Sequence, residues 1–352
     1  MPDALAPMAP PLPLSPALSG LMARGAAFLG SPLAIMGGAM SWVSERHLVS
    51  AISEAGGFGV IACGSMGPAL LEAEIRATQA LTRRPFGVNL ITMHPELDAL
   101  IAVCLRLGVG HVVLAGGVPS GPAVRAVKDG GAKLVCFAPA LALAKRLVRL
   151  GADALVIEGS EAGGHIGPVS LTVLAQEILP VVRDVPVFVA GGLGRGEAIL
   201  AYLDMGAAGA QLGTKFAAST DSIAHPAFKQ AFVRAAARDA MPSQQLDARF
   251  PVIPVRGLAN AGTARFLAHQ AEVLGQFQAG TLTKEAAQLS IEHFWAGALR
   301  RAVVDGDVEQ GSVMAGQSVG LVTSIEPVAA IVAGLVAQAE AALAARTAPV
   351  PV

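Results

Sequence analysis

Charged side chains are scarce in this 352-residue chain: they make up 14% of the sequence, against 53% hydrophobic residues. The 25 basic and 26 acidic residues nearly cancel to a net charge of −1, and no basic cluster alternates with aromatic residues. Nucleic-acid binding, which needs concentrated positive charge, is therefore not expected. The same composition implies a large core under a modest polar shell and is compatible with a homodimer.

Cysteine is equally scarce. The three cysteines, Cys63, Cys104 and Cys136, stand far apart, and none belongs to a Cys-x-x-Cys or zinc-binding spacing. All three lie in apolar segments, which predicts core residues and no metal site. An odd count without a disulfide framework fits a reducing compartment, so we expect a cytoplasmic protein.

Long hydrophobic runs are absent from the sequence. The longest candidate, residues 327–339, has thirteen residues before Glu340 interrupts it, whereas a membrane-spanning helix needs about 20. The first twenty residues are rich in Pro and Ala but lack the positive start and apolar core of a signal peptide. We therefore expect a soluble protein with a flexible tail over residues 1–25.

Short apolar runs alternate with longer helical patterns from about residue 32 to 216, which predicts βα units in a parallel sheet. The eight expected strands are 33–36, 59–62, 86–90, 111–115, 133–137, 154–157, 187–190 and 210–213. Helical patterns fall at 46–55, 69–81, 95–107, 139–150, 170–179 and 196–205. Eight strands predict a (β/α)8 TIM barrel over residues 26–218. The alternative, an open doubly wound sheet, lacks its Gly-x-Gly-x-x-Gly fingerprint after the first strand.

The alternation stops after Phe216. Residues 219–303 have helical patterns and connections, which we interpret as a helical substrate-side subdomain over the C-terminal mouth of the barrel. Residues 304–346 form a glycine-rich loop and a terminal helix, which we expect to return to the barrel.

Glycine, in contrast to charge and cysteine, is abundant, and it gathers around one histidine. The segment Glu158-Gly-Ser-Glu-Ala-Gly-Gly-His165-Ile-Gly167 follows a predicted strand and has four glycines within nine residues. Missing Cβ atoms let a flat ligand approach the backbone, and one imidazole there could act as acid, base or hydrogen-bond donor. His165 is therefore the candidate catalytic residue. The simpler interpretation is a tight turn with a surface histidine.

Two later strands also end in glycine. Val187-Phe-Val-Ala-Gly191-Gly192 is followed, after a helical pattern, by Ala210-Gln-Leu-Gly213-Thr214. Barrel enzymes bind phosphate in the loops after their seventh and eighth strands, where backbone N–H groups suit an anion. Glycine also ends αβ units for structural reasons, so the order and spacing of the segments carry this prediction.

Together these segments resemble the nitronate monooxygenase family, also called 2-nitropropane dioxygenase-like, and its close relative the FMN-dependent enoyl-acyl carrier protein reductase II. The likeness covers residues 32–341. It rests on Gly37-Gly-Ala-Met40-Ser-Trp42-Val, Pro85-Phe-Gly-Val-Asn89, Ala142-Leu-Ala-Lys145-Arg, Glu158-Gly-Ser-Glu-Ala-Gly-Gly-His165, Ala190-Gly-Gly, Gly213-Thr214 and Met314-Ala-Gly-Gln317.

The resemblance implies one non-covalent FMN at the barrel mouth, with His165 as the active-site histidine. By motif position the FMN contacts are Ala39, Met40, Ser41, Asn89, Gly163, Gly164, Ala190, Gly191, Gly192, Gly213 and Thr214. The chain departs from the family in its first loop, where relatives commonly have a glutamine before the glycines. It also has Lys215 where arginine is usual, which keeps the charge and loses the bidentate fork.

The resemblance further implies an FMN-dependent oxidoreductase with small-molecule substrates. The favoured activity is oxidation of alkyl nitronates with O₂ to a carbonyl compound and nitrite. The alternative is an NAD(P)H-dependent reductase of enoyl thioesters, and a less favoured one is an NAD(P)H:quinone reductase. A flavin-binding protein without turnover, or a barrel that binds a phosphorylated metabolite without flavin, belongs to a different class.

Some residues allow two interpretations. Glu158 and Glu161 could orient His165, cap the following helix or stay solvated at the mouth. Trp42 could contact the flavin or belong to the core. His225 precedes Pro226 at an expected helix start, so we predict a structural role for it.

Overall fold

Eight parallel strands form the centre of the molecule in the computed structural model, which describes residues 13–347. They follow one another in the order β1-β9-β8-β6-β5-β4-β3-β2. Their bounds are β1 Ile35–Gly37, β2 Gly59–Ala62, β3 Phe86–Ile91, β4 His111–Ala115, β5 Lys133–Phe137, β6 Ala154–Glu158, β8 Val187–Ala190 and β9 Gly209–Leu212. Every predicted strand is present, with ends shifted by no more than two residues.

The sheet closes on itself between its first and last members. β1 pairs in parallel with β9, with Met36 opposite Gln211. On its other side Met36 forms a bridge with Phe58, and Phe58 N donates a hydrogen bond to Ile35 O at 2.8 Å. The predicted (β/α)8 barrel is thus confirmed, and the open doubly wound alternative is wrong.

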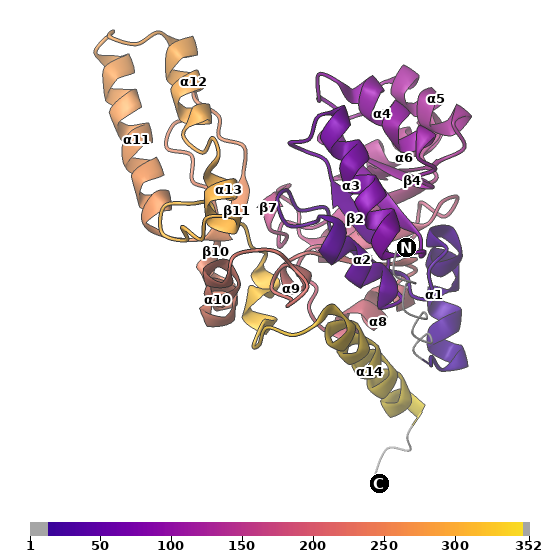
Figure 1. Ribbon diagram of the computed structural model, residues 1–352. Coiled ribbons are helices and arrows are strands. Elements are labelled where there is room, and N and C mark those ends of the chain that lie inside the picture. Colours follow the sequence, from indigo (N-terminus) through magenta and orange to yellow (C-terminus); the bar gives the residue numbers. More distant parts are fainter. Residues whose placement is uncertain (1–12, 348–352) are drawn as a thin grey trace.

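Helices surround the strands (Figure 1). Their bounds are α2 Arg46–Glu54, α3 Pro68–Leu81, α4 Leu97–Arg106, α5 Gly121–Asp129, α6 Leu141–Leu150, α7 Leu171–Ile178, α8 Gly196–Asp204 and α9 Thr214–Ala217. α5 is absent from the predicted helices. It begins at Ser120, whose hydroxyl accepts a hydrogen bond from Ala123 N, and Pro122 occupies its first turn, as proline often does.

The expected flexible tail is wrong for residues 16–25, which belong to helix α1 (Pro16–Leu29). Ser15 caps this helix by accepting a hydrogen bond from Leu18 N, and Pro16 supplies its first turn. Leu18, Met22 and Leu29 are buried, so apolar packing fixes the helix against the barrel. Residues 1–12 of the expected tail lie outside the described residues.

Aromatic contacts at the N-terminal end of the strands show which side chains point into the barrel. The ring of His111, at the start of β4, lies 4.8 Å from the ring of Phe58 and 5.2 Å from that of Phe28, on α1. Phe28 also contacts Phe188 of β8 at 6.1 Å. Because Phe58, His111 and Phe188 meet at one place, they face the interior, and the period of two along a strand assigns the other inward positions.

A smaller unit stands beside the barrel. Its three-stranded sheet has the order β10-β11-β7, with β7 (Gly164–His165) contributed by the histidine loop, β10 spanning Ala240–Pro242 and β11 spanning Val255–Leu258. Its helices are α10 Pro226–Arg234, η1 Ala237–Asp239, α11 Ala261–Gln278, α12 Lys284–His293 and α13 Ala298–Val303. The sequence patterns do not predict these strands, since each has only two to four residues.

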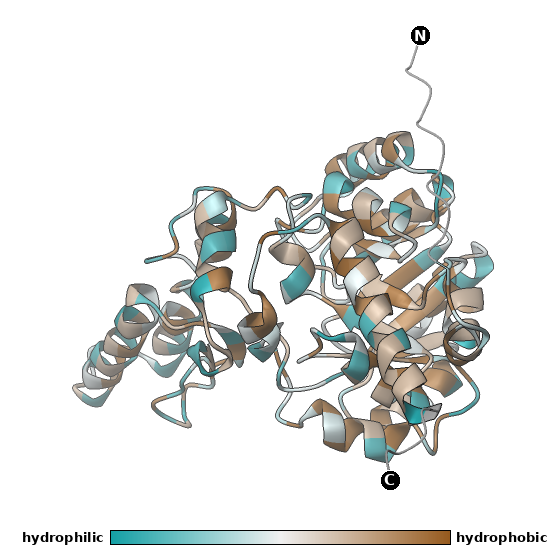
Figure 2. Ribbon diagram, turned by 90° about the horizontal axis from the view of Figure 1, so that it is seen from below, coloured by the Kyte–Doolittle hydropathy of each residue, from teal (hydrophilic) through white to brown (hydrophobic). Residues whose placement is uncertain are grey.

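The α11–α12 hairpin extends away from the barrel in both views (Figures 1 and 2). It has an apolar core of its own, formed by Phe250, Phe266, Val273, Ala287 and Ile291. The β10-β11-β7 sheet, which includes the histidine loop, and α13, whose Arg300 lies over the Trp42 ring, join this unit to the loops of the barrel, whereas the hairpin points away from them (Figure 1).

The chain then returns through η2 (Gln317–Leu321) to α14 (Val328–Thr347), which packs against α8 and α2. Among residues 13–347, α14 alone has the length and hydropathy of a membrane span. Its large apolar side chains, among them Val332, Leu335 and Val336, are buried. Over the candidate span as a whole, 33% is buried inside the protein.

Candidate functional site

Three polar side chains face the interior at the C-terminal ends of the strands. Asn89 follows the inward Gly87 of β3 by two residues, and Gln211 of β9 pairs with the inward Ala190 of β8. Glu158 ends β6 opposite Ala190. Asn89 and Gln211 are only 6% and 8% exposed, yet none of the three side chains makes a hydrogen bond within residues 13–347. Their polar atoms are not among the fully buried atoms without a partner in residues 13–347, so they are open toward the barrel mouth and available to a ligand.

Gln211 and the inward direction of Glu158 are absent from the residues that the sequence motifs select. The sequence could have indicated Gln211 as a site residue, because it is a polar residue within an apolar strand, two positions before Gly213. Glu158 is more telling chemically, because burial raises the pKa of its carboxyl to about 7. The site therefore holds a carboxyl group that can change its proton near neutral pH.

The loop after β1 is fixed above this layer. Gly38 N donates to Leu212 O at 2.8 Å, and the Ser44 hydroxyl donates to Gly38 O at 2.8 Å while it accepts from Met40 N at 3.0 Å. Ala39, Met40 and Ser41, the predicted flavin contacts, are half-buried on this loop. A Cβ placed on Gly213 would lie 3.4 Å from Met40 Sδ, so the loops after β1 and β9 lie side by side.

Trp42 is the one non-glycine residue with a positive φ among residues 13–347, at 67°. It is 39% exposed and is therefore not a core residue, and its ring centroid lies 5.9 Å from Arg300 Cζ of α13. A left-handed conformation at a bulky residue costs of order 1–3 kcal/mol, and such strain concentrates at ligand sites. Trp42 thus stands at the rim, between the first loop and the smaller unit.

The histidine loop crosses the 314–317 segment at close range. A Cβ on Gly163 would lie 2.6 Å from Gly316 N, and a Cβ on Gly316 would lie 2.8 Å from Glu161 O. Gln317 N donates to Glu161 O at 2.9 Å, and Gly316 N donates to the Thr214 hydroxyl at 3.0 Å. The glycine-rich segment near the C-terminus therefore reaches the barrel mouth and connects two of the predicted site loops.

The two acidic residues of the histidine loop have different positions. Glu161 caps α7, because its carboxylate accepts a hydrogen bond from Leu171 N at 3.0 Å. Of the possibilities for Glu161, helix capping thus matches the contacts. Glu158 instead faces the interior, and neither carboxylate makes a hydrogen bond to His165.

His165 lies on β7, opposite Val255 of β11. Its imidazole is exposed and makes no hydrogen bond within the described part of the chain. The buried Arg256 holds the same loop: its guanidinium donates to Ser160 O at 2.9 Å and to Ala240 O at 2.5 Å. The imidazole is thus free for a ligand, on a backbone fixed by the neighbouring sheet.

The two glycines after β8 are required by the backbone conformation and by close contacts with the histidine loop. Gly191 and Gly192 have φ values of 94° and 71°, which favour glycine. A Cβ on Gly191 would lie 2.9 Å from Gly159 O, and one on Gly192 would lie 3.0 Å from Glu161 Cβ. Ala190 O accepts a hydrogen bond from Gly159 N at 3.0 Å. These residues thus hold the histidine loop against β8, next to the mouth.

Gly164 is buried with a φ of 76°, and a Cβ placed on it would lie 3.5 Å from Met314 Sδ. Lys215 donates to Leu321 O at 3.4 Å. His225 accepts a hydrogen bond from Ala227 N as the cap of α10, which matches its predicted structural role. The three cysteines are buried and free.

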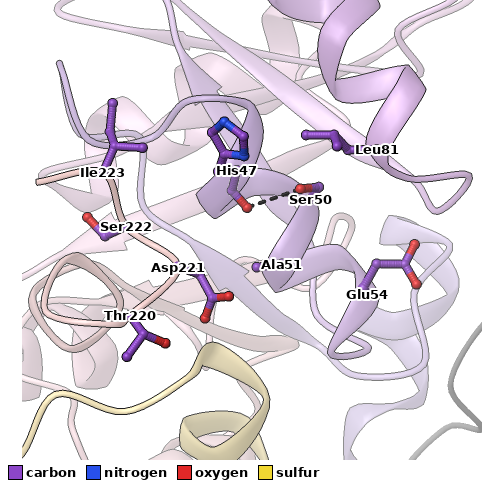
Figure 3. Close-up of a pocket in the computed structure, with 9 residues that line it drawn as sticks. All are labelled: His47, Ser50, Ala51, Glu54, Leu81, Thr220, Asp221, Ser222 and Ile223. Atoms are coloured by element: carbon purple, nitrogen blue, oxygen red, sulfur yellow. Dashed lines mark hydrogen bonds between the residues drawn. The ribbon is translucent and has the colours of Figure 1, made fainter. Parts of the chain in front are cut away.

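A separate hollow of about 490 Å³ lies on the outer side of α2 (Figure 3). Its walls come from α2, the end of α3 and the loop after α9: His47, Ser50, Ala51, Glu54, Leu81, Thr220, Asp221, Ser222 and Ile223. None of the predicted site residues lines it. Its acidic groups also have structural partners, since Glu54 accepts from the Thr82 hydroxyl and Asp221 accepts from Val328 N.

The fold defines a class: the (β/α)8 barrels, whose enzymes have their sites at the C-terminal ends of the strands. The family model described as nitronate monooxygenase matches residues 26–338. The chain belongs to this family of oxidoreductases, as the sequence motifs predict.

Individual similar proteins carry different names. The chain is 30% identical to (3aS,4S,5R,7aS)-5-hydroxy-7a-methyl-1-oxo-octahydro-1H-indene-4-carboxyl-CoA dehydrogenase of Rhodococcus jostii (strain RHA1), over 85% of this chain and 90% of that one. It is 29% identical to nitronate monooxygenase of Paraburkholderia phytofirmans (strain DSM 17436 / LMG 22146 / PsJN), over 87% and 92%. The structure of FabK from Thermotoga maritima matches with a TM-score of 0.81 and 33% identity, over 95% and 99%.

Proposed function

We propose that the protein is an FMN-dependent oxidoreductase whose flavin lies over the polar layer at the barrel mouth. The observation that carries this proposal is the set of inward polar groups, Asn89, Glu158 and Gln211, which have no hydrogen-bond partner in the described chain. When bound, FMN supplies two-electron chemistry at carbon, and the protein supplies orientation and proton transfer.

The loops around this layer suit a flat, phosphorylated ligand. A Cβ on Gly38 would meet its nearest atom at 3.5 Å and one on Gly213 at 3.4 Å, which are ordinary contacts, so protein packing does not require glycine at either position and a ligand close to the backbone would. The Thr214 hydroxyl accepts from Gly316 N and keeps its own hydrogen for an anion. We assign the ring to the space above Asn89 and Gln211, and the phosphate to the loops after β8 and β9.

His165 is our candidate for the group that acts on the substrate. Its exposed imidazole stands at the rim, on a loop held by β11 and Arg256. From there it can donate a hydrogen bond to a substrate carbonyl or nitro oxygen, or move a proton at the neighbouring carbon. Fixed backbone and free imidazole together suit a residue that must meet the substrate in one orientation.

For the substrate we favour an acyl thioester. The relative named as a carboxyl-CoA dehydrogenase supports this class, because it aligns over most of both chains at 30% identity. Alkyl nitronate is the second candidate, supported by the family description and by the 29% identical nitronate monooxygenase. The same imidazole serves either reaction, since both place an oxygen acceptor beside an acidic carbon.

The test begins with purified protein loaded with FMN under anaerobic conditions. NADH, NADPH and ethyl nitronate are added separately, and the flavin absorbance is followed. Bleaching by a pyridine nucleotide, reversed by crotonyl-CoA, would support thioester chemistry. Bleaching by ethyl nitronate alone would favour the nitronate reaction, and failure to bind FMN at any pH would refute the proposal.

His165→Ala tests the assigned residue. We expect turnover with the productive substrate to fall by about 10²–10⁴-fold, as for loss of a general acid or base, while the FMN dissociation constant stays within twofold of wild type. Unchanged turnover would leave His165 as an incidental surface residue. His165→Asn serves as a control, because it keeps a hydrogen-bond donor and removes the titratable group.

A further inference from the structure

Within residues 13–347 the Glu158 carboxyl has neither a hydrogen-bond partner nor an ion pair. Glu158 is the last residue of β6, and its inward neighbour on β8 is Ala190. On the other side, β5 contributes the inward Phe137, which pairs with Val156 two residues before Glu158. Two apolar strands therefore flank the carboxyl, and its open direction is the space above the barrel.

The ionisable groups nearest in the chain are directed elsewhere. Glu161 caps Leu171 N, and the guanidinium of Arg256 is used by Ser160 O and Ala240 O. His165 lies exposed on β7, in a different sheet. Burial is the sole cause of the raised Glu158 pKa, so no cation from β5, β8 or the loops compensates a negative charge there.

An ionised carboxylate in these surroundings would bring only acceptor oxygens to the site, whereas the protonated form has a donor. The oxidised isoalloxazine of FMN presents mostly acceptors, its two carbonyl oxygens and the ring nitrogens N1 and N5, beside a single donor, N3–H. We propose that Glu158 binds FMN as a neutral carboxylic acid and donates its proton in a hydrogen bond to an acceptor of the ring. This inference rests on the proposed function, and it adds a second proton donor at the site, the Glu158 carboxyl, beside His165.

The consequence is a cofactor affinity that weakens as pH rises. With the pKa near 7, the protonated fraction of Glu158 in the apoprotein is about 0.9 at pH 6 and about 0.03 at pH 8.5. If only the protonated form binds, the apparent dissociation constant increases by about 30-fold over this range. The direction follows from the raised pKa: the competent form is present below the pKa and is lost above it.

The experiment measures FMN dissociation constants of the apoprotein by quenching of flavin fluorescence at pH 6, 7 and 8.5. Glu158→Gln is the informative variant, because its amide donates a hydrogen bond at every pH. Glu285→Gln, on the exposed start of α12, is the matched control. The FMN phosphate also titrates near pH 6, but it does so equally in all proteins, and riboflavin as a second probe removes it.

We expect wild type and Glu285→Gln to lose about 30-fold in FMN affinity between pH 6 and 8.5, and Glu158→Gln to lose less than threefold. Glu158→Leu should bind at least tenfold more weakly than wild type at pH 6. Equal pH profiles in wild type and Glu158→Gln would overturn the inference and leave the proposed function intact. No FMN binding by wild type at any pH would overturn the proposed function itself. Circular dichroism of each apoprotein establishes that the variants are folded.

Discussion

Replacing Thr214 with Val tests the contact that joins two glycine-rich segments of the site. The Thr214 hydroxyl accepts a hydrogen bond from Gly316 N at 3.0 Å, and Thr214 is 9% exposed. Val keeps the shape of the side chain and removes the oxygen, so Gly316 N loses its partner in a buried place. We expect the free energy of unfolding of the apoprotein to fall by about 1–3 kcal/mol, the usual cost of an unsatisfied buried donor.

The same substitution should weaken the cofactor site. Gly316 lies against the histidine loop, where Gln317 N also donates to Glu161 O at 2.9 Å. Loss of the Thr214 hydroxyl removes the acceptor for Gly316 N and the donor that we propose for the FMN phosphate. A hydrogen bond to a charged group contributes about 1.5–3 kcal/mol, which predicts a dissociation constant for FMN about 10- to 100-fold higher.

The assay compares Thr214→Val with Thr214→Ser, which keeps the hydroxyl. Urea unfolding of both apoproteins gives the stability difference, and titration with FMN gives the affinity. Stabilities of the two variants within about 0.5 kcal/mol of each other would refute the structural argument. Lower stability with unchanged FMN affinity would refute the assignment of Thr214 to the phosphate.

Two further predictions test the room for FMN beside Gly213 and the placement of the His165 loop by Arg256. Gly213→Ala should keep the free energy of unfolding within about 1 kcal/mol of wild type, because the nearest atom to its Cβ is Met40 Sδ at 3.4 Å. The same substitution should raise the FMN dissociation constant at least tenfold. An unchanged dissociation constant in a fluorescence titration would show that the cofactor does not contact this loop. Arg256→Met should lower kcat while FMN affinity stays unchanged, because the guanidinium holds the loop of His165 through Ser160 O. Partial recovery of kcat in Arg256→Lys, measured by steady-state kinetics, would support a role in positioning His165. Loss of FMN binding together with kcat would indicate a merely structural role.

The barrel could be predicted from local sequence because its strands are short apolar runs, buried on both faces and separated by helical patterns. The histidine loop and the glycine pair after β8 were also within reach, since φ values above zero favour glycine at Gly164, Gly191 and Gly192. Helix α1 shows the limit. Its Pro- and Ala-rich surroundings favour disorder, yet Leu18 and Met22 find buried surface on the barrel.

Composition and local spacing thus predicted the barrel and the candidate histidine, because periodic burial and glycine geometry are visible in neighbouring residues, and the resemblance of the motifs indicated the family. Only the tertiary structure decided what those residues meet. Three features join residues that are far apart in the sequence: the pairing of β7 with β11, the hydrogen bond from Gly316 N to Thr214, and the inward set of Asn89, Glu158 and Gln211. These contacts depend on strand register and on the return of the C-terminal segment to the barrel, and neither can be read from the spacing of a single motif.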